Sequence, residues 1–141
     1  MKPLLSICFF LLFSPLVAQN ADDVLGLWLV QDKDAYIRIY EKDGKYFGKV
    51  TWIAEPYDEN GNPVSDSDGN PILEMEIMKG FVFEDNEWVD GTVYDAEMGK
   101  TYYGSMEMEN NNTLNLRGSL DSFGLIGRTE TWTRLEERGN K

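Results

Sequence analysis

The chain has 141 residues and a formal net charge of −12, with 13 Lys and Arg against 25 Asp and Glu. Such a surface repels phosphate backbones and anionic lipid, which argues against a nucleic-acid-binding protein. The chain contains no histidine and a single cysteine, Cys8, and the lack of histidine excludes Ser-His-Asp and Cys-His catalytic triads. Only carboxylates, Tyr, Lys and Arg are left for chemistry, so we expect no enzymatic activity, no metal site and no cofactor.

The N-terminal residues predict a secretory signal peptide. A positive charge comes first, an almost unbroken apolar run follows from Leu4 to Phe13, and Val17-Ala18-Gln19 offers small residues for cleavage. We predict a signal peptide over residues 1–18, cut between 18 and 21, and a secreted or periplasmic protein. The alternative is an uncut anchor, but the run is shorter than the roughly 20 apolar residues of a spanning helix. Cleavage would remove Cys8, so neither a disulfide nor a cysteine-based zinc site could form.

Apolar and polar residues alternate two by two from Leu25 onward, which is the period of a β-strand. The pattern predicts eight short strands rich in β-branched and aromatic residues. In chain order they are 25–30, 35–40, 46–53, 79–84, 88–94, 101–108, 113–120 and 125–135. No 3.6-residue apolar stripe follows the signal, so we expect no substantial helix.

Short turn sequences separate most of these strands. Lys42-Asp43-Gly44-Lys45 is a hairpin signal, because glycine accepts the positive φ of a tight turn, and residues 84–87, 96–99 and 110–112 are similar breaks. Strands joined by short turns pair with their sequence neighbours, and closing an eight-stranded sheet removes its exposed edges. We therefore predict a single all-β domain, an eight-stranded antiparallel up-and-down barrel.

The connection from Glu55 to Pro71 fits neither a strand nor a helix. Loops of this length in compact domains are lids or binding loops, or else plain surface loops, and the sequence leaves both open. Two similar segments, 58–63 and 66–71, begin with Asp and end in Gly-Asn-Pro, with oxygen side chains spaced as in an EF-hand. Proline at the sixth position and the lack of Glu at the twelfth contradict an EF-hand. We predict two Asn/Asp-Gly turns, with a looser calcium loop as the alternative.

Both ends of the predicted domain carry a known signature. Gly26-Leu27-Trp28 and Thr131-Trp132-Thr133-Arg134 resemble the structural signature of the calycin superfamily, which includes the lipocalins. The resemblance implies that Arg134 packs over Trp28 and helps to close one end of the barrel, through a cation–π contact worth on the order of 0.5–2 kcal/mol. It gives Gly26, Trp28, Trp132 and Arg134 a structural role and no catalytic one.

The chain from 23 to 135 also resembles a bacterial family, the domain of unknown function 2147. The resembling stretches are 26–28, 39–45, 48–50, 70–71, 91–95, 99–102, 116–118, 127–129 and 132–134. The resemblance implies a secreted or periplasmic lipocalin-like barrel with no established activity, followed by a tail over residues 136–141. The chain departs from the family at Ala96, where proline is common, and in the acidic, Met-rich segment from Leu73 to Met78.

Four residues are candidates for binding a ligand inside the barrel. If Tyr94, Tyr102, Arg117 and Arg128 point inward, they give a mostly apolar cavity a few polar anchors, as ligand pockets have. The arginines would favour an anionic amphipathic ligand such as a fatty acid. The alternative is an interior filled by the protein's own side chains, as eight-stranded barrels can be.

Two functions fit these observations. The first is binding of a small apolar or amphipathic molecule, which predicts a hollow interior beside the loop 55–71. The second is a protein-interaction or inhibitor module of the cell envelope, which predicts a solid core and an exposed apolar patch around Ile72 to Phe83. The sequence leaves both open.

Overall fold

The computed structural model describes residues 19–135. The predicted signal peptide (1–18) and the predicted tail (136–141) lie outside the described residues. A short 3₁₀ helix, η1 (Ala21–Val24), precedes eight strands. They are β1 (Gly26–Leu29), β2 (Ala35–Lys42), β3 (Lys45–Ile53), β4 (Glu76–Glu84), β5 (Glu87–Asp95), β6 (Lys100–Asn110), β7 (Thr113–Ser119) and β8 (Gly127–Arg134). Within residues 19–135, no helix has the length and apolar character needed to cross a bilayer.

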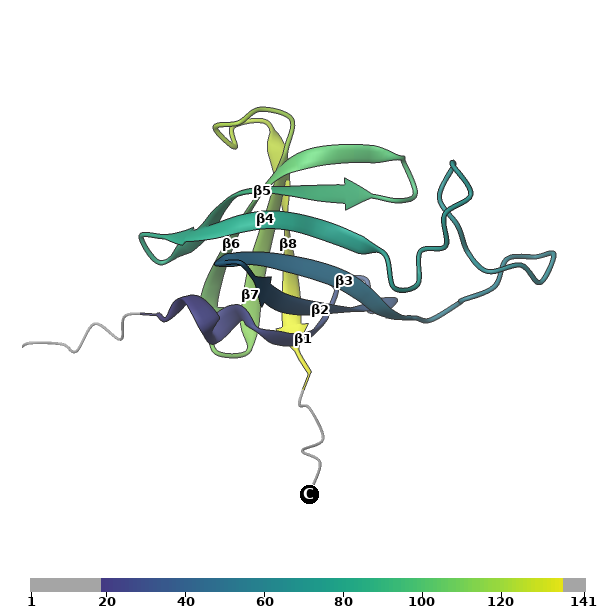
Figure 1. Cartoon of the computed structure of the whole chain (residues 1–141), viewed down its shortest axis with the longest axis horizontal. Helices are drawn as coiled ribbons and strands as arrows, with labels where there is room; N and C mark the ends of the chain where they lie inside the picture. Colours follow the sequence, from purple (N-terminus) through teal and green to yellow (C-terminus); the bar gives the residue numbers. More distant parts are fainter. Residues whose placement is uncertain (1–18, 136–141) are drawn as a thin grey trace, which may run out of the picture.

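The eight strands form a closed antiparallel barrel. Each strand pairs with the next one along the chain, and β8 returns to pair with β1 (Figure 1). This confirms the predicted all-β, up-and-down architecture. Most strand bounds lie within two residues of the prediction. The start of β4 differs more, at Glu76 instead of 79, and β8 begins at Gly127, because Leu125 and Ile126 belong to the preceding loop.

One end of the barrel, here called the plugged end, is covered by η1. The indole N–H of Trp28 donates to the Val24 carbonyl at 2.9 Å, and that of Trp88 donates to the Ala21 carbonyl at 3.0 Å. Val24 itself is fully buried. The opposite end, here called the loop end, carries the connections 30–34, 54–75, 96–99 and 120–126. The long connection 54–75 projects well beyond the strands (Figure 1).

Large side chains fill the barrel interior above inward-facing glycines. Gly91 and Gly104 lie opposite each other in the β5–β6 register, and the Phe81 ring covers both. A Cβ atom at Gly91 would lie 2.3 Å from Cδ2 of Phe81, and one at Gly104 would lie 2.7 Å from its Cζ. Met78 occupies the space above Gly48 in the same way. Since Phe81 and Met78 are 0% exposed, this part of the interior is solid, which is the alternative that the sequence left open.

A β-bulge in β5 places Trp88 and Gly91 on the same face of the strand. Trp88 and Gly91 are three positions apart, so strict alternation would put them on opposite faces. The β5–β6 register shifts between them, and Asp90 takes a φ of 60°. A bulge adds one residue to a strand and so re-aims the residues after it. Both Trp88 and Gly91 are therefore buried in the interior.

Candidate functional site

The plugged end is held by the signature residues at the two ends of the domain. The Arg134 guanidinium lies 4.3 Å from the centroid of the Trp28 ring, as the resemblance implied. It also donates to the backbone carbonyls of Leu25 at 2.7 Å, Asn111 at 2.6 Å, and Asp23. Gly26 has a φ of 126°, and a Cβ atom there would lie 2.9 Å from Nη1 of Arg134. This end of the barrel is therefore a structural closure, to which buried Trp132 also contributes.

Two of the four candidate ligand residues, Tyr94 and Arg117, lie on the outer face. Arg117 alternates along β7 with buried Leu116, and it donates to the Gly124 carbonyl at 2.7 Å and to Oγ1 of Thr129 at 3.2 Å. Tyr94 alternates on β5 with Val93, which packs against the core, and its hydroxyl donates to a carboxylate of the long loop. The interior position predicted for Tyr94 and Arg117 is wrong, because the opposite parity of each strand carries the core residues.

The other two candidates, Tyr102 and Arg128, share the inward-facing rows at the loop end. Tyr102 lies on the same face of β6 as buried Gly104 and Met106, two and four positions further along the strand, and it is half-buried. Arg128 lies opposite Gly118 in the β7–β8 register and is exposed. The Lys100 ammonium lies 5.5 Å from the centroid of the Tyr102 ring. The structure thus sets these two residues near the rim of the barrel, and their ligand-binding role stays a prediction.

The long connection folds into two tight lobes. In each lobe the first Asp accepts two backbone N–H bonds through one carboxylate oxygen: Asp58 from Asn60 and Asn62, both at 2.9 Å, and Asp66 from Asp68 at 3.1 Å and Asn70 at 2.9 Å. These are Asx turns, in which a side chain replaces a backbone acceptor. The two predicted Asn/Asp-Gly turns are thus confirmed. In the described residues 19–135, no group of three or more carboxylates is placed to hold a metal ion.

The second lobe is attached to the barrel wall by one hydrogen bond. The Tyr94 hydroxyl donates to the free carboxylate oxygen of Asp66 at 3.0 Å. The backbone N–H of Asn70 and this hydroxyl both donate to the ionised carboxylate. Their effect outweighs that of desolvation, so the pKa of Asp66 lies below its usual value. The same bond raises the pKa of Tyr94. Asp66 therefore shapes its own turn and anchors that turn to β5.

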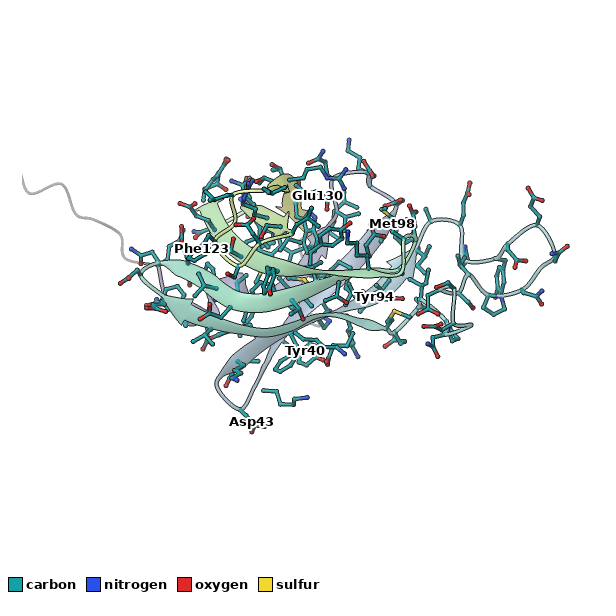
Figure 2. All side chains as sticks on the ribbon, turned by 90° about the horizontal axis from the view of Figure 1, so that it is seen from above. Tyr40, Asp43, Tyr94, Met98, Phe123 and Glu130 are labelled. Atoms are coloured by element: carbon teal, nitrogen blue, oxygen red, sulfur yellow. The ribbon has the colours of Figure 1, made fainter. Side chains whose placement is uncertain are left out.

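A groove of about 680 Å³ lies between this lobe and the outer face of the barrel. Its walls include Asp66 and Pro71 from the loop, Lys79 from β4, and Thr92 and Tyr94 from β5. Figure 2 shows Tyr94 on the side of the barrel from which the long loop extends. We call this hollow the loop groove; it lies outside the barrel wall.

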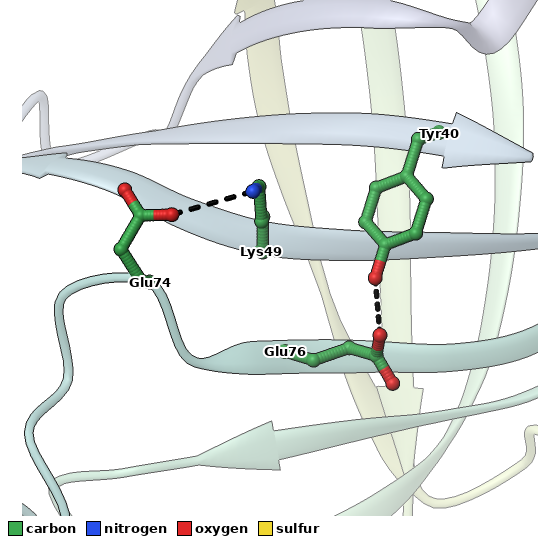
Figure 3. A network of polar contacts seen from close by, with 4 residues as sticks. All are labelled: Tyr40, Lys49, Glu74 and Glu76. Atoms are coloured by element: carbon green, nitrogen blue, oxygen red, sulfur yellow. Dashed lines mark hydrogen bonds and ion pairs between the residues drawn. The ribbon is translucent and has the colours of Figure 1, made fainter.

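Two polar pairs fix the chain where it leaves the long loop and enters β4 (Figure 3). Nζ of Lys49 lies 3.3 Å from the carboxylate of Glu74, and the Tyr40 hydroxyl donates to the carboxylate of Glu76. Burial, together with this carboxylate, raises the pKa of Tyr40 to about 12. The acidic residues that distinguish this segment therefore serve on the outer surface of β2, β3 and β4.

The loop between β7 and β8, which we call the apolar loop (residues 120–126), presents large apolar side chains to solvent. Phe123 is 86% exposed, Leu125 80% and Ile126 63%. Phe123 and Met98, another exposed apolar residue, lie well apart in Figure 2, so Met98 is not part of this patch. In the range Ile72 to Phe83, where the sequence predicted such a patch, Leu73 is exposed, whereas Met78 and Phe81 are buried in the core.

The apolar loop is fixed from below by polar contacts. The Asp121 carboxylate accepts the backbone N–H groups of Leu125 at 3.0 Å and Ile126 at 2.7 Å, and these bonds lower the pKa of Asp121. Arg117 binds the Gly124 carbonyl, and Gly124 takes a φ of 76°. The backbone groups of Gly124, Leu125 and Ile126 thus find partners within the loop and on β7, while the side chains of Phe123, Leu125 and Ile126 are exposed. Asp121 and Gly124 are typical turn residues and indicate a loop in the sequence, but the apolar Leu125 and Ile126 favour the strand that was predicted there.

Comparison with known proteins places this fold in a family. Residues 26–134 match the family model described as "Uncharacterized protein conserved in bacteria (DUF2147)". Among solved structures, the chain is similar to protein HP1028 from Helicobacter pylori, described as belonging to the lipocalin family, with 20% identity over 80% of this chain and 83% of that one and a TM-score of 0.65. No curated protein matches the chain. At this level of identity the structural likeness shows the fold, a lipocalin-like barrel. On the match from Gly26 to Arg134, the chain belongs to the bacterial DUF2147 family.

Proposed function

We propose that this protein is an exported, non-enzymatic barrel that acts as a protein-interaction module through its outer surface. The filled part of the interior supports this function, because Phe81 and Met78 occupy the space above Gly48, Gly91 and Gly104 that an internal ligand would otherwise enter. Export rests on the predicted signal peptide. The absence of histidine supports a function without acid–base or nucleophilic catalysis of the triad type.

The apolar loop is the observation that carries the proposal. Large apolar side chains that gather on an exposed surface mark interaction sites in soluble proteins. Here Phe123, Leu125 and Ile126 are held outward by the bonds of Asp121 and Arg117. A loop that is already ordered loses little conformational entropy on binding, and this raises affinity. The loop therefore has both the chemistry and the rigidity of a binding surface.

A crosslinking experiment tests this function. Phe123 is replaced by the photoreactive p-benzoylphenylalanine, and the protein is irradiated in the cells that produce it. The matched control carries the same group at Glu107, which is exposed on β6 outside the apolar loop. We expect a discrete crosslinked protein from position 123 and none from position 107. Absence of a specific product at position 123 would contradict the proposal.

The loop groove supports a second candidate function, the binding of a small amphipathic molecule outside the barrel. The groove combines apolar walls from Pro71 and Ile77 with polar groups of Lys79, Thr92 and Tyr94, and such a mixture is typical of ligand sites. Its volume of about 680 Å³ lies within the roughly 300–1,000 Å³ of such sites. Lys79 would favour an anionic head group.

Native mass spectrometry of the protein purified from cells tests the second candidate. A retained small molecule that is lost on Lys79→Gln, and kept in the control Lys45→Gln on the β2–β3 hairpin, would support binding in the loop groove. Lys45 is exposed at the plugged end, away from the groove. A bare protein mass in the presence of a broad set of lipids would contradict this candidate and leave the interaction module standing.

A further inference from the structure

The barrel is incompletely closed at the seam between β1 and β8. Seven register pairs join β7 to β8, from Thr113↔Thr133 to Ser119↔Gly127. Only two join β1 to β8, Trp28↔Arg134 and Leu29↔Thr133, because β1 ends at Leu29. No strand of residues 19–135 pairs with the seam side of Gly127–Glu130. The first half of β8 is therefore a sheet edge in an otherwise closed barrel.

The backbone bonds on either side of this stretch show which groups face the seam. Thr131 N–H donates across the seam to Oε1 of Gln31 at 2.9 Å, whereas Arg134 N–H donates to the Asn112 carbonyl on the β7 side. The N–H and C=O of one strand residue point to the same side, and the side alternates along the strand. Gly127 and Thr129 therefore direct their N–H and C=O groups into the seam, where both residues are exposed.

An edge of this kind is complementary to the backbone of an extended peptide. A row of unpaired N–H and C=O groups pairs with an added strand, which is the binding mode called β-augmentation. The apolar loop ends where this edge begins, at Ile126 and Gly127. A peptide lying along the edge would therefore meet the exposed apolar side chains at one end of its path.

The charges around the seam indicate the chemistry of the peptide. The turn across the seam carries exposed Asp32 and Asp34 with exposed Lys33 between them, so the turn has a small net negative charge, and the whole chain has a net charge of −12. A second copy of the chain would be repelled by this charge, whereas a basic segment would be attracted. The edge, the apolar loop and the negative net charge of the chain together favour a basic, apolar strand from another protein.

We propose that the open edge of β8, Gly127–Glu130, binds an extended peptide segment of a partner protein, with alternating apolar residues and basic flanks, as an added strand. This inference rests on the proposed interaction function and names its site and its binding mode. The added strand takes its hydrogen bonds from Gly127 and Thr129 and packs its apolar residues against the apolar loop.

The test uses a backbone substitution. Thr129→Pro removes the N–H that faces the seam and leaves the β7–β8 hydrogen bonds in place, since proline is tolerated on edge strands. Thr129→Ala is the matched control: both variants lose the contact of Oγ1 with Arg117, but only the alanine variant keeps the N–H. The probe is a synthetic nine-residue peptide of alternating valine and threonine with a lysine at each end, and a second version carries N-methyl groups on alternate amides.

Fluorescence anisotropy measures the binding of the labelled peptides. We expect wild type and Thr129→Ala to bind the probe with equal affinity, and Thr129→Pro to bind it about tenfold more weakly, the effect of a lost backbone hydrogen bond. The N-methylated peptide should bind wild type at least as weakly as the probe binds the proline variant, because its methyl groups remove more than one donor. This second comparison needs no variant, so it decides the question even if Thr129→Pro does not fold.

Three results would overturn the inference. The first is equal binding of the two peptides to wild type, and the second is equal binding of the probe to Thr129→Pro and Thr129→Ala. The third is a dimer in sedimentation velocity that Thr129→Pro dissociates, because this result would assign the edge to a second copy of the chain. The crosslink at position 123 separates this inference from the proposed function. If that crosslink forms equally in the Thr129→Pro background, the edge is not the site, while the interaction function stands.

Discussion

The contact between Phe81 and Gly91 allows a quantitative test of the solid interior. In the variant Gly91→Ala, the new Cβ would lie 2.3 Å from Cδ2, 2.4 Å from Cγ and 2.5 Å from Cε2 of the Phe81 ring. Carbon atoms in contact prefer about 3.5–4.0 Å, so the ring must move by more than about 1 Å. It also lies against Gly104 and is 0% exposed, which leaves it no free space on that side.

The expected cost comes from this geometry. Overpacking a filled core costs about 1–3 kcal/mol and sometimes more, and we expect Gly91→Ala to reach the upper part of that range. Gly118→Ala is the control, because its Cβ would lie 3.6 Å from the Cβ of Tyr102, an ordinary contact. A glycine with ordinary φ that accepts a methyl group gains about 0.4–1 kcal/mol through the unfolded chain. The two substitutions should therefore change stability in opposite directions.

Replacing the ring itself identifies the cause. Phe81→Leu leaves a cavity and costs stability on its own, but it removes the ring atoms with which the methyl group of the Gly91→Ala variant would collide. In a double-mutant cycle, Gly91→Ala should then cost about 1–2 kcal/mol less than in the wild-type background. Guanidinium unfolding, monitored by tryptophan fluorescence, measures all four free energies of unfolding. Additive costs, or equal effects of Gly91→Ala and Gly118→Ala, would refute the filled interior.

Three further predictions concern the closure and the surface contacts. Arg134→Ala should lower the free energy of unfolding by about 2 kcal/mol or more in chemical denaturation, since Trp28 loses its cation and the carbonyls accepting from the guanidinium lose a charged donor. Tyr94→Phe should accelerate amide exchange in the loop lobe that begins at Asp66, because the lobe loses its hydrogen bond to β5. In wild type the lowered pKa of Asp66 contributes stability at pH values above the pKa of this carboxyl in the unfolded chain, and the contribution is lost as pH falls through its pKa in the folded protein. Acid should therefore accelerate exchange in the same lobe. Tyr40 should ionise near pH 12 in an ultraviolet titration, and its raised pKa contributes stability that is lost as pH rises through that value.

The sequence predicts most strongly those features that short-range chemistry determines. Alternation and turn residues locate the eight strands, and the Asp-Gly-Asn-Pro repeats determine two Asx turns because Asp58 and Asp66 bind N–H groups only a few residues away. The placement of Arg134 over Trp28 is predicted by resemblance, since nothing local connects residues 106 positions apart. The alternation along β7 also predicts that Arg117 points outward, because Leu114 and Leu116 mark the inward-facing positions of this strand.

Features that depend on register and on distant partners were not predictable from the sequence. The bulge at Asp90 adds one residue to β5, and no glycine or proline at that position marks it. This bulge inverts the facing of the residues after it, so Tyr94 points outward, where Asp66, 28 positions earlier in the chain, accepts its hydrogen bond. Leu125 and Ile126, the last two residues of the apolar loop, were predicted as strand because they continue the apolar pattern of β8. The competing signal, capture of their N–H groups by Asp121, becomes evident only in three dimensions.

The seam and the closure have a common physical origin in the shortness of β1. Four residues are enough for β1 to place Trp28 beneath Arg134 and seal the plugged end, but they cannot cover the eight residues of β8. An uncovered edge invites indiscriminate pairing, and natural sheets limit it with inward-pointing charges. Arg128 and Glu130 occupy the inward row of this edge, so a strand that adds here must leave both charges hydrated or paired. An uncharged, purely apolar strand would remove water from Arg128 and Glu130 and offer them no partner. A strand with polar or charged residues opposite these two would replace the lost water with hydrogen bonds or ion pairs. The same two charges that oppose indiscriminate pairing would therefore make the edge selective.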